Sequence, residues 1–263
     1  MSERPISDRP ISEPDARPEL HRVVRTMGTV FSCTVRAAPT PLLHKALDEA
    51  EALLHHLDRV FSPYREDSAV SLVNRGEPVP ARWQSELYQV THLCAEAHQR
   101  TGGWFAAWRG GRFDPSGLVK GWAVERAADL LLDAGAEHIC LNGGGDIQLH
   151  GGPWQVGVSH PLRPGELAAL VSHTEGPLAL ATSGPAERGC HIVDPHTGAA
   201  PSPALASLTV TAASLTEADT VATAAYAMGE RARPWLTGHA GLRGLAAFAV
   251  AADGSTWTTP QSG

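Results

Sequence analysis

Residues 41–61 place an apolar side chain at every third or fourth position, which predicts an α-helix of about five turns. The stretch before it follows another pattern. From Leu20 onward, two runs rich in β-branched residues are separated by Met27-Gly28. Such runs predict two strands or one bent hairpin. Ser62-Pro63 then ends the helical pattern, so the chain combines extended and helical segments from its start.

The remaining segments mix helices and strands in irregular order. Helical patterns follow at 68–74, 85–100, 118–134 and 216–228, the last with Thr216 as its expected N-cap. Strands are expected at 138–141, 146–150, 154–159, 178–182, 207–213 and 245–251, of which the last would be the final strand. Residues 101–113 are expected to form a loop. Because strands and helices do not alternate regularly, we expect an α+β fold rather than a doubly wound parallel sheet.

The charge balance excludes two kinds of partner. The chain has 21 Lys and Arg against 28 Asp and Glu, a net charge of −7. A nucleic-acid-binding protein needs a positively charged face, and so does a protein that binds an anionic membrane surface. Neither nucleic acid nor a membrane is therefore expected as a partner. No stretch approaches the roughly eighteen apolar residues of a membrane span. A negatively charged protein that handles a nucleotide would need local cations, metal ligands or oriented backbone amides.

The N-terminus and the cysteines bear on location. Residues 1–18 are rich in Pro, Ser and charged residues and lack the apolar stretch of a secretory signal, so we expect a disordered tail. The four cysteines contain no CxxC pair and no repeated spacing. This pattern is typical of reduced thiols rather than of a disulfide framework or a zinc site. The protein is therefore expected in the cytoplasm.

The segment 113–122 combines a turn with a helix start. Asp114 to Gly117 read as a turn, and the following residues begin a helix, whose free amides favour phosphate. Lys120, one turn into the helix, would add a full positive charge. Taken alone, the segment is better explained by an Asp-capped helix with a solvated lysine.

The segment 141–146, LNGGGD, lies between two expected strands. Three glycines allow close approach of a ligand, but an Asn-Gly start is equally typical of a tight hairpin turn. No GK[ST] follows, and no GxGxxG leads into a helix, so neither a P-loop nor a dinucleotide fingerprint is present.

Two further segments carry polar residues. Ser183, His191 and Asp194 could be imagined as a hydrolase triad, but no nucleophile elbow surrounds the serine, and a ligand-facing polar loop is the favoured interpretation. Asp219 and Thr223 are four residues apart and so share one helix face. Carboxylate and hydroxyl oxygens are ligands that magnesium accepts. A helix-start Asp with a back-bonded Thr would explain the pair without a metal.

In order along the chain, these segments resemble the ApbE family of FAD:protein FMN transferases. The matching stretches are MGT at 27–29, FSPYREDSAVSLVN at 61–74, DPSGLVKGWAVERAADLL at 114–131, NGGGDI at 142–147, ATSG at 181–184, HIVDPHTG at 191–198 and EADTVATAAYAMG at 217–229. Each stretch is weak alone, but the ordered set is specific. The resemblance implies an α+β fold with a T-fold-like core, one domain over residues 19–263, and FAD bound in a cleft that a metal helps to close.

The resemblance also implies site residues. The positions that match family contacts to FAD are Met27, Tyr64, Asp114, Lys120 and Val193, with Trp104, Phe105 and Ala106 as the equivalent of a family triplet. The implied magnesium ligands are Asp219, Thr223 and the backbone carbonyl of Gly117. Two departures stand out: the triplet ends in Ala106 where the family usually has a carboxylate, and the stretch from there to Asp114 is short. We therefore expect FAD to be held differently on that side.

The expected reaction is magnesium-dependent transfer of FMN from FAD to a Thr or Ser hydroxyl of an acceptor protein that has an FMN-binding domain, with release of AMP. Asp219 would serve catalysis through the metal, and His191 is the candidate base because imidazole titrates near neutral pH. Asp146 is a weaker candidate. With water as the nucleophile, the same site would be an FAD pyrophosphatase. A catalytically silent FAD-binding protein is the third interpretation. The sequence leaves the acceptor and the oligomeric state open.

Overall fold

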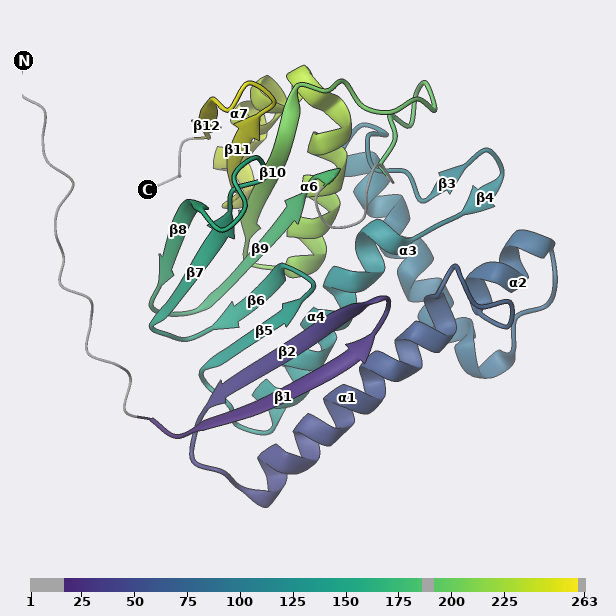
Figure 1. The fold of residues 1–263 in the computed structure, drawn as a ribbon. Helices are drawn as coiled ribbons and strands as arrows, with labels where there is room; N and C mark the ends of the chain where they lie inside the picture. The colour runs from purple at the N-terminus through teal and green to yellow at the C-terminus, as the bar shows by residue number, and fades with distance from the viewer. Residues whose placement is uncertain (1–16, 186–191, 260–263) are drawn as a thin grey trace, which may run out of the picture.

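An eight-stranded antiparallel sheet forms the centre of the fold (Figure 1). The computed structural model describes residues 17–185 and 192–259. The strand order is β1-β2-β5-β6-β9-β10-β11-β12. The bounds are β1 Glu19–Thr26, β2 Thr29–Arg36, β5 Ile139–Gly143, β6 Asp146–His150, β9 Pro177–Ser183, β10 Leu205–Ala212, β11 Ala246–Ala251 and β12 Thr256–Thr258. The predicted α+β class is confirmed.

Helices cover one face of this sheet (Figure 1). Helix α4 lies between α1 and α6 and contacts β5, while α6 contacts β9 and β10. The helix bounds are α1 Pro41–Phe61, α2 Ala69–Arg75, α3 Gln84–Arg100, α4 Ser116–Asp133, α6 Leu215–Met228 and α7 Ala232–Arg243. The main hydrophobic core lies between these helices and the sheet.

A smaller core lies on the opposite face of the sheet. The hairpin of β7 (Trp154–Ser159) and β8 (Leu167–His173) packs there, with Trp154 and Val156 against Leu149 and Leu180. Successive side chains of a strand point to opposite faces. In β9, Leu180 therefore joins this smaller core, while its neighbours Ala179 and Ala181 join the main one. The functional site described below lies on the other face of the sheet, among the helices.

Helix α1 has the bounds that its apolar period predicts. Thr40 caps it, its Oγ1 accepting a hydrogen bond of 3.1 Å from the N–H of Leu43, and Pro41 occupies the first helical position. Its buried face includes Leu47, Leu54 and Leu57. Full burial of a leucine side chain stabilises a fold by about 1.5–3 kcal/mol, so this face fixes α1 against the core.

The hairpin predicted around Met27-Gly28 is also confirmed. Strands β1 and β2 pair from Thr26–Thr29 outward, which leaves a two-residue turn. Met27 has φ +50° and Gly28 has φ +69°, the left-handed conformations that a type I′ turn requires. A non-glycine residue is uncommon there, and the turn presents Met27 at the rim of the cavity described below.

The triple-glycine segment forms a hairpin turn. Asn142 and Gly143 end β5, Asp146 begins β6, and Gly144 and Gly145 between them both have positive φ. The Asn142 side-chain oxygen accepts a 2.8 Å hydrogen bond from the N–H of Gly145. The interpretation of this segment as a tight hairpin turn is therefore confirmed.

Several local predictions are wrong. Ser214, not Thr216, caps α6, because its Oγ accepts from the N–H of Glu217 at 3.3 Å. Strand β11 is followed by β12 and is not the last strand. Residues 101–113 contain the short hairpin of β3 (Trp108–Arg109) and β4 (Arg112–Phe113). Strand β8 and helix α7 were not expected. The predicted tail and domain boundaries stay predictions, since residues 1–16 lie outside the described range.

The described cysteines are free thiols inside the fold. Cys33, Cys94 and Cys140 form no disulfide, and burial raises the thiol pKa to about 12 for Cys33 and Cys94 and to about 11 for Cys140. Cys190 lies outside the described residues.

These pKa values predict slow alkylation. Because the thiolate is the reactive form, Cys33 and Cys94 in the native protein should react with iodoacetamide at pH 8 about a hundredfold more slowly than in urea-unfolded protein. Peptide mass spectrometry over time measures this. Equal rates in the two states would contradict the burial of these thiols.

None of the helices within the described residues is long and apolar enough to span a membrane.

Candidate functional site

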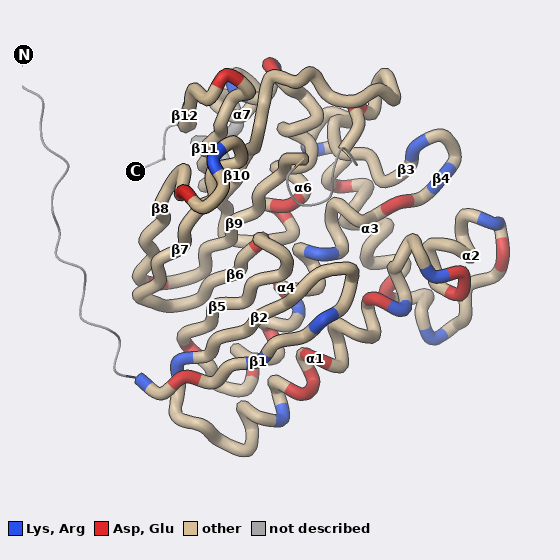
Figure 2. The backbone as a smooth tube through the Cα atoms, in the orientation of Figure 1, with Lys and Arg blue, Asp and Glu red and all other residues tan. Residues whose placement is uncertain are grey.

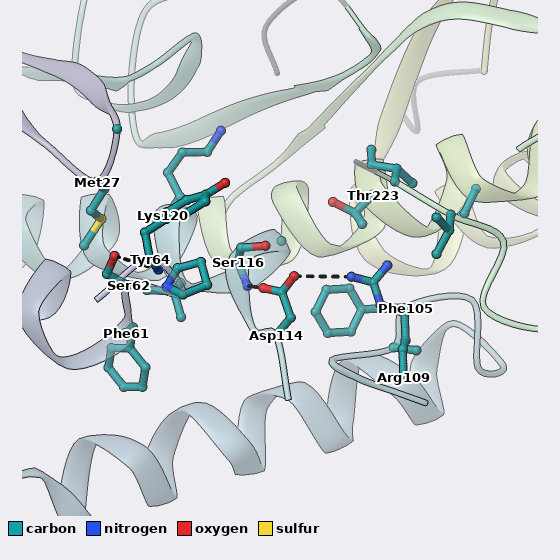
Figure 3. A pocket seen from close by; sticks show the side chains of 18 of the residues that line it. Met27, Phe61, Ser62, Tyr64, Phe105, Arg109, Asp114, Ser116, Lys120 and Thr223 are labelled. Atoms are coloured by element: carbon teal, nitrogen blue, oxygen red, sulfur yellow. Dashed lines mark hydrogen bonds and ion pairs between the residues drawn. The ribbon is translucent and has the colours of Figure 1, made fainter. Parts of the chain in front are cut away.

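A cavity of about 450 Å³ opens at the start of α4 (Figure 3). This volume is in the range of small-molecule sites. Its wall draws residues from segments far apart in the sequence. The lining residues are Met27, Gly28, Leu57, Asp58, Phe61, Ser62, Pro63, Tyr64, Trp104, Phe105, Ala106, Arg109, Asp114, Ser116, Gly117, Val119, Lys120, Ile192, Val193, Pro195, Thr223 and Ala227.

One end of the cavity is mainly apolar and aromatic. It is built by the β1–β2 turn, with Met27, and by the C-terminus of α1 with the turn after it, including Phe61, Ser62 and Tyr64 (Figure 3). Tyr64 is 94% exposed. An aromatic ring so placed is available to stack on a planar ligand.

Phe105 lies across the cavity from Met27 (Figure 3), and its chain neighbours Trp104 and Ala106 also line the cavity. Thr101 fixes this loop: its Oγ1 accepts from the N–H of Phe105 at 2.9 Å. His98 Nδ1 lies 2.9 Å from the carbonyl oxygen of Phe105, which can only accept, so Nδ1 donates. The backbone of Phe105 is therefore held at its N–H by Thr101, the C-cap residue of α3, and at its carbonyl by His98 within α3.

Asp114 stands between Met27 and Phe105 (Figure 3). Its Oδ1 accepts from the N–H of Ser116 at 3.1 Å, and its Oδ2 lies 3.3 Å from Arg109 Nη2. The residue before it, Phe113, is clamped by Asn74, whose side chain bonds both the N–H (2.6 Å) and the carbonyl (2.9 Å) of Phe113. Helix α2 thus fixes where the chain enters α4.

Lys120 lines the cavity and forms an ion pair with Asp146. Both side chains are largely buried, at 12% and 2% exposure. The other oxygen of Asp146 accepts from the N–H of Thr182 at 2.9 Å. Asp146 does not line the cavity itself. Its ion pair with Lys120 instead fixes the position of the Lys120 ammonium.

The predicted magnesium ligands lie where α4 meets α6. Asp219 is 6% exposed, and its Oδ2 accepts from the N–H of Gly121 at 3.2 Å. The usual helical partner of that N–H is the carbonyl of Gly117. A Cβ on Gly117 would lie 3.2 Å from Thr223 Oγ1, which places the Thr223 hydroxyl against this residue.

This donor set fits a magnesium ion. It offers a carboxylate, a hydroxyl and a backbone carbonyl, which are hard oxygen ligands of the kind magnesium takes together with water or phosphate. Within residues 17–185 and 192–259, no group of three or more His, Cys, Asp and Glu side chains could hold a metal. A site with a single carboxylate does not need such a group.

Two polar side chains, the half-buried Glu125 and the buried Gln148, anchor the N-terminus of α6. Glu125 of α4 accepts at Oε2 from Ser214 Oγ (2.9 Å), from the Thr216 N–H (3.1 Å) and from Thr216 Oγ1 (2.5 Å). Gln148 of β6 accepts from the Leu215 N–H at 3.0 Å. These bonds satisfy amides that a helix start otherwise leaves without partners. They also fix α6, and with it Asp219 and Thr223, against α4.

The structure brings together most of the residues singled out from the sequence. The cavity wall contains Met27, Tyr64, Trp104, Phe105, Ala106, Asp114, Gly117, Lys120, Val193 and Thr223. Asp219 lies buried behind the wall and His191 lies outside the described residues. Sequence reasoning missed Arg109, because residues 101–113 were treated as a loop. It also missed Phe61, Ser62 and Ser116, although all three lie within or beside the quoted motifs.

The fold and the cavity define an α+β protein with a ligand-sized cavity, lined by aromatic and apolar side chains and by the charged residues Asp58, Arg109, Asp114 and Lys120. The ApbE family model matches residues 27–110 and 106–247. The chain belongs to the ApbE family.

Three curated relatives are each named FAD:protein FMN transferase. That of Haemophilus influenzae is 30% identical over 130 residues, covering 44% of this chain and 38% of the relative. That of Rhodobacter capsulatus is 34% identical over 162 residues, covering 57% and 30%. The chain therefore matches well under half the length of these relatives.

Solved structures share the fold over nearly the whole chain. Flavin transferase ApbE from Vibrio cholerae aligns with TM-score 0.72 and 23% identity, covering 92% of this chain and 97% of that structure. The apo flavinyl transferase ApbE of Pseudomonas stutzeri aligns with TM-score 0.76 and 20% identity, covering 94% and 97%. At this identity the likeness establishes the fold alone.

Proposed function

We propose that this protein transfers FMN from FAD to a Thr or Ser hydroxyl of an acceptor protein and releases AMP, with magnesium at the site of Asp219, Thr223 and Gly117. One observation supports the proposal most strongly. Ten of the candidate site residues chosen from the sequence line the same cavity, in a chain of the ApbE family. The names of the curated relatives support the same activity.

The cavity suits a dinucleotide in its chemistry. FAD has two planar ring systems joined through a diphosphate. The cavity is lined by aromatic and apolar side chains and by the first turn of α4. The positive end of the α4 helix dipole and the charge of Lys120 favour an anion at that point.

In the proposed reaction, the acceptor hydroxyl oxygen bonds to the FMN phosphorus, the P–O bond to AMP breaks, and AMP leaves with the bridging oxygen. Bound magnesium would offset the negative charge that develops on the phosphates. Asp219, Thr223 and the Gly117 carbonyl would hold it. Lys120, oriented by Asp146, adds a fixed positive charge. We propose that His191 acts as the general base and takes the proton of the acceptor hydroxyl. This role rests on the sequence alone.

The proposal is tested by incubating the protein with FAD, magnesium and a generic FMN-binding acceptor domain. Intact-mass spectrometry should show the acceptor gaining one FMN less one water, and EDTA should abolish the gain. The matched control is the same acceptor with its target Thr replaced by Val.

Other outcomes separate the alternatives. FMN and AMP in solution with an unmodified acceptor, and the same result with further acceptor domains, would indicate an FAD pyrophosphatase. Intact FAD in the presence of magnesium would indicate a catalytically silent FAD-binding protein. An adduct that forms equally well in EDTA would contradict the magnesium site but leave the transferase activity standing.

A further inference from the structure

The β3–β4 hairpin places a basic residue in the cavity wall. Within the described chain, Arg109 and Lys120 are the cations that line the cavity. Figure 2 shows basic positions on this hairpin, in a chain whose net charge is −7. A 2.7 Å hydrogen bond from the N–H of Asp114 to the carbonyl of Ala107 joins the two ends of the hairpin. The hairpin therefore stays folded beside the cavity, with Arg109 in the cavity wall.

Arg109 has donors to spare. Its recorded partner within the described residues is Asp114, at 3.3 Å from Nη2, and its side chain is 34% exposed. A guanidinium carries five N–H donors in a planar fork. One long contact leaves most of them available to a ligand, while Asp114 keeps the group at the cavity wall.

Lys120 differs from Arg109 in this respect. Its ammonium is paired with Asp146, whose carboxylate is almost fully buried. A buried ion pair of this kind is costly to break, because it would leave an uncompensated charge. Of the two cations, Arg109 is therefore the better placed to gain a new anionic partner.

The position of Arg109 indicates which part of a ligand it meets. Asp114 accepts from the Arg109 guanidinium at Oδ2 and from the N–H of Ser116, the first amide of α4, at Oδ1. Guanidinium and helix-start amides both favour phosphate oxygens, the former through paired, parallel hydrogen bonds. We propose that Arg109 binds a phosphate of the FAD diphosphate and is a substrate-binding residue of this chain. The identity of the ligand rests on the function proposed above.

The test is the binding of FAD and riboflavin, measured by flavin fluorescence in EDTA, for wild type and three variants. Arg109→Gln is expected to raise the Kd for FAD about 10- to 100-fold, the range for a lost charged hydrogen bond. The Kd for riboflavin, which has no phosphate, should stay within about twofold. Arg109→Lys should fall between, because it keeps the charge and loses the fork. Arg112→Gln, directly opposite on β4 and outside the cavity wall, is the matched control.

Several results would overturn the inference: an unchanged Kd for FAD in Arg109→Gln, an equal loss of riboflavin binding, or the same loss in Arg112→Gln. Binding needs neither acceptor nor turnover, so the two proposals can fail separately. Arg109-dependent FAD binding without any FMN transfer would contradict only the transferase. FMN transfer by wild type with an unchanged FAD Kd in Arg109→Gln would contradict only the role of Arg109. A wild-type protein that binds no FAD would contradict both.

Discussion

Replacement of Asp219 by Asn is expected to lower the rate of FMN transfer about a thousandfold, with a fold that stays intact. Asn keeps the shape and an oxygen that can accept from the Gly121 N–H, so the α4–α6 contact survives. The negative charge is lost, and with it the carboxylate that would attract magnesium at the proposed site. If that removes about 4 kcal/mol of transition-state stabilisation, the rate falls by this factor. Transfer is measured by intact mass, and magnesium binding by calorimetry on the same samples.

The control is Glu217→Gln on the same helix. Glu217 is partly exposed and lies 3.6 Å from Arg100, so its loss should change the rate by no more than about twofold. Asp219→Asn with wild-type rate and wild-type magnesium affinity would rule out the proposed site. If Asp219→Asn lowers the rate of FMN transfer but leaves the magnesium affinity unchanged, Asp219 is not a magnesium ligand but still contributes to the reaction.

Gly121→Ala is expected to destabilise the protein by about 1–3 kcal/mol, the usual cost of overpacking a core. A Cβ on Gly121 would lie 2.7 Å from the backbone oxygen of Leu215 and 3.1 Å from the Cβ of Asp219. The nearer atom is backbone at the start of α6 and cannot rotate away. The helices must separate, which shifts Asp219. Urea unfolding measures the loss of stability.

Gly238→Ala in α7 is the matched control, because a Cβ there meets nothing within 4 Å and the position has no positive φ. Replacing glycine by alanine at a compatible helical position stabilises by about 0.4–1 kcal/mol. The two variants should therefore move the urea midpoint in opposite directions. A stable Gly121→Ala would show that α4 and α6 do not pack this closely.

Local periodicity was sufficient to predict much of this fold. The α1 pattern gave both ends of the helix because a cap, a proline and a following Ser-Pro coincide with the apolar period. The Met27-Gly28 break marked a true hairpin for a similar reason, since two short β-branched runs flank residues that can turn. Where several local signals agree, little is left for tertiary structure to decide.

The missed elements depend on tertiary packing. Strand β8 has no clean alternation, and it is a strand because it pairs with β7 over the smaller core. Helix α7 contains Pro234 and Gly238, which argue against a helix when read alone, yet it packs on α6 and β11. Ser214 rather than Thr216 caps α6, and Glu125, distant in sequence, fixes this helix start by accepting from both hydroxyls. None of these partners is visible within a short window of sequence.

The site shows the same division. The resemblance to the ApbE family located ten cavity residues, because each stands at a position that matches a functional position of that family. Arg109 could not be found this way. Its place in the wall depends on a four-residue turn of a hairpin and on the carboxylate of Asp114, and an Arg between two glycine-containing turns has no pattern of its own.

The wall of the cavity begins at Met27 and ends at Ala227, with α6 contributing its last residues. A ribosome that has released only the first strands and helices has therefore not yet released a complete site. The nascent chain cannot gain ligand-binding energy until α6 has emerged and packed, so a ligand of this cavity would stabilise complete chains and not partly synthesised ones.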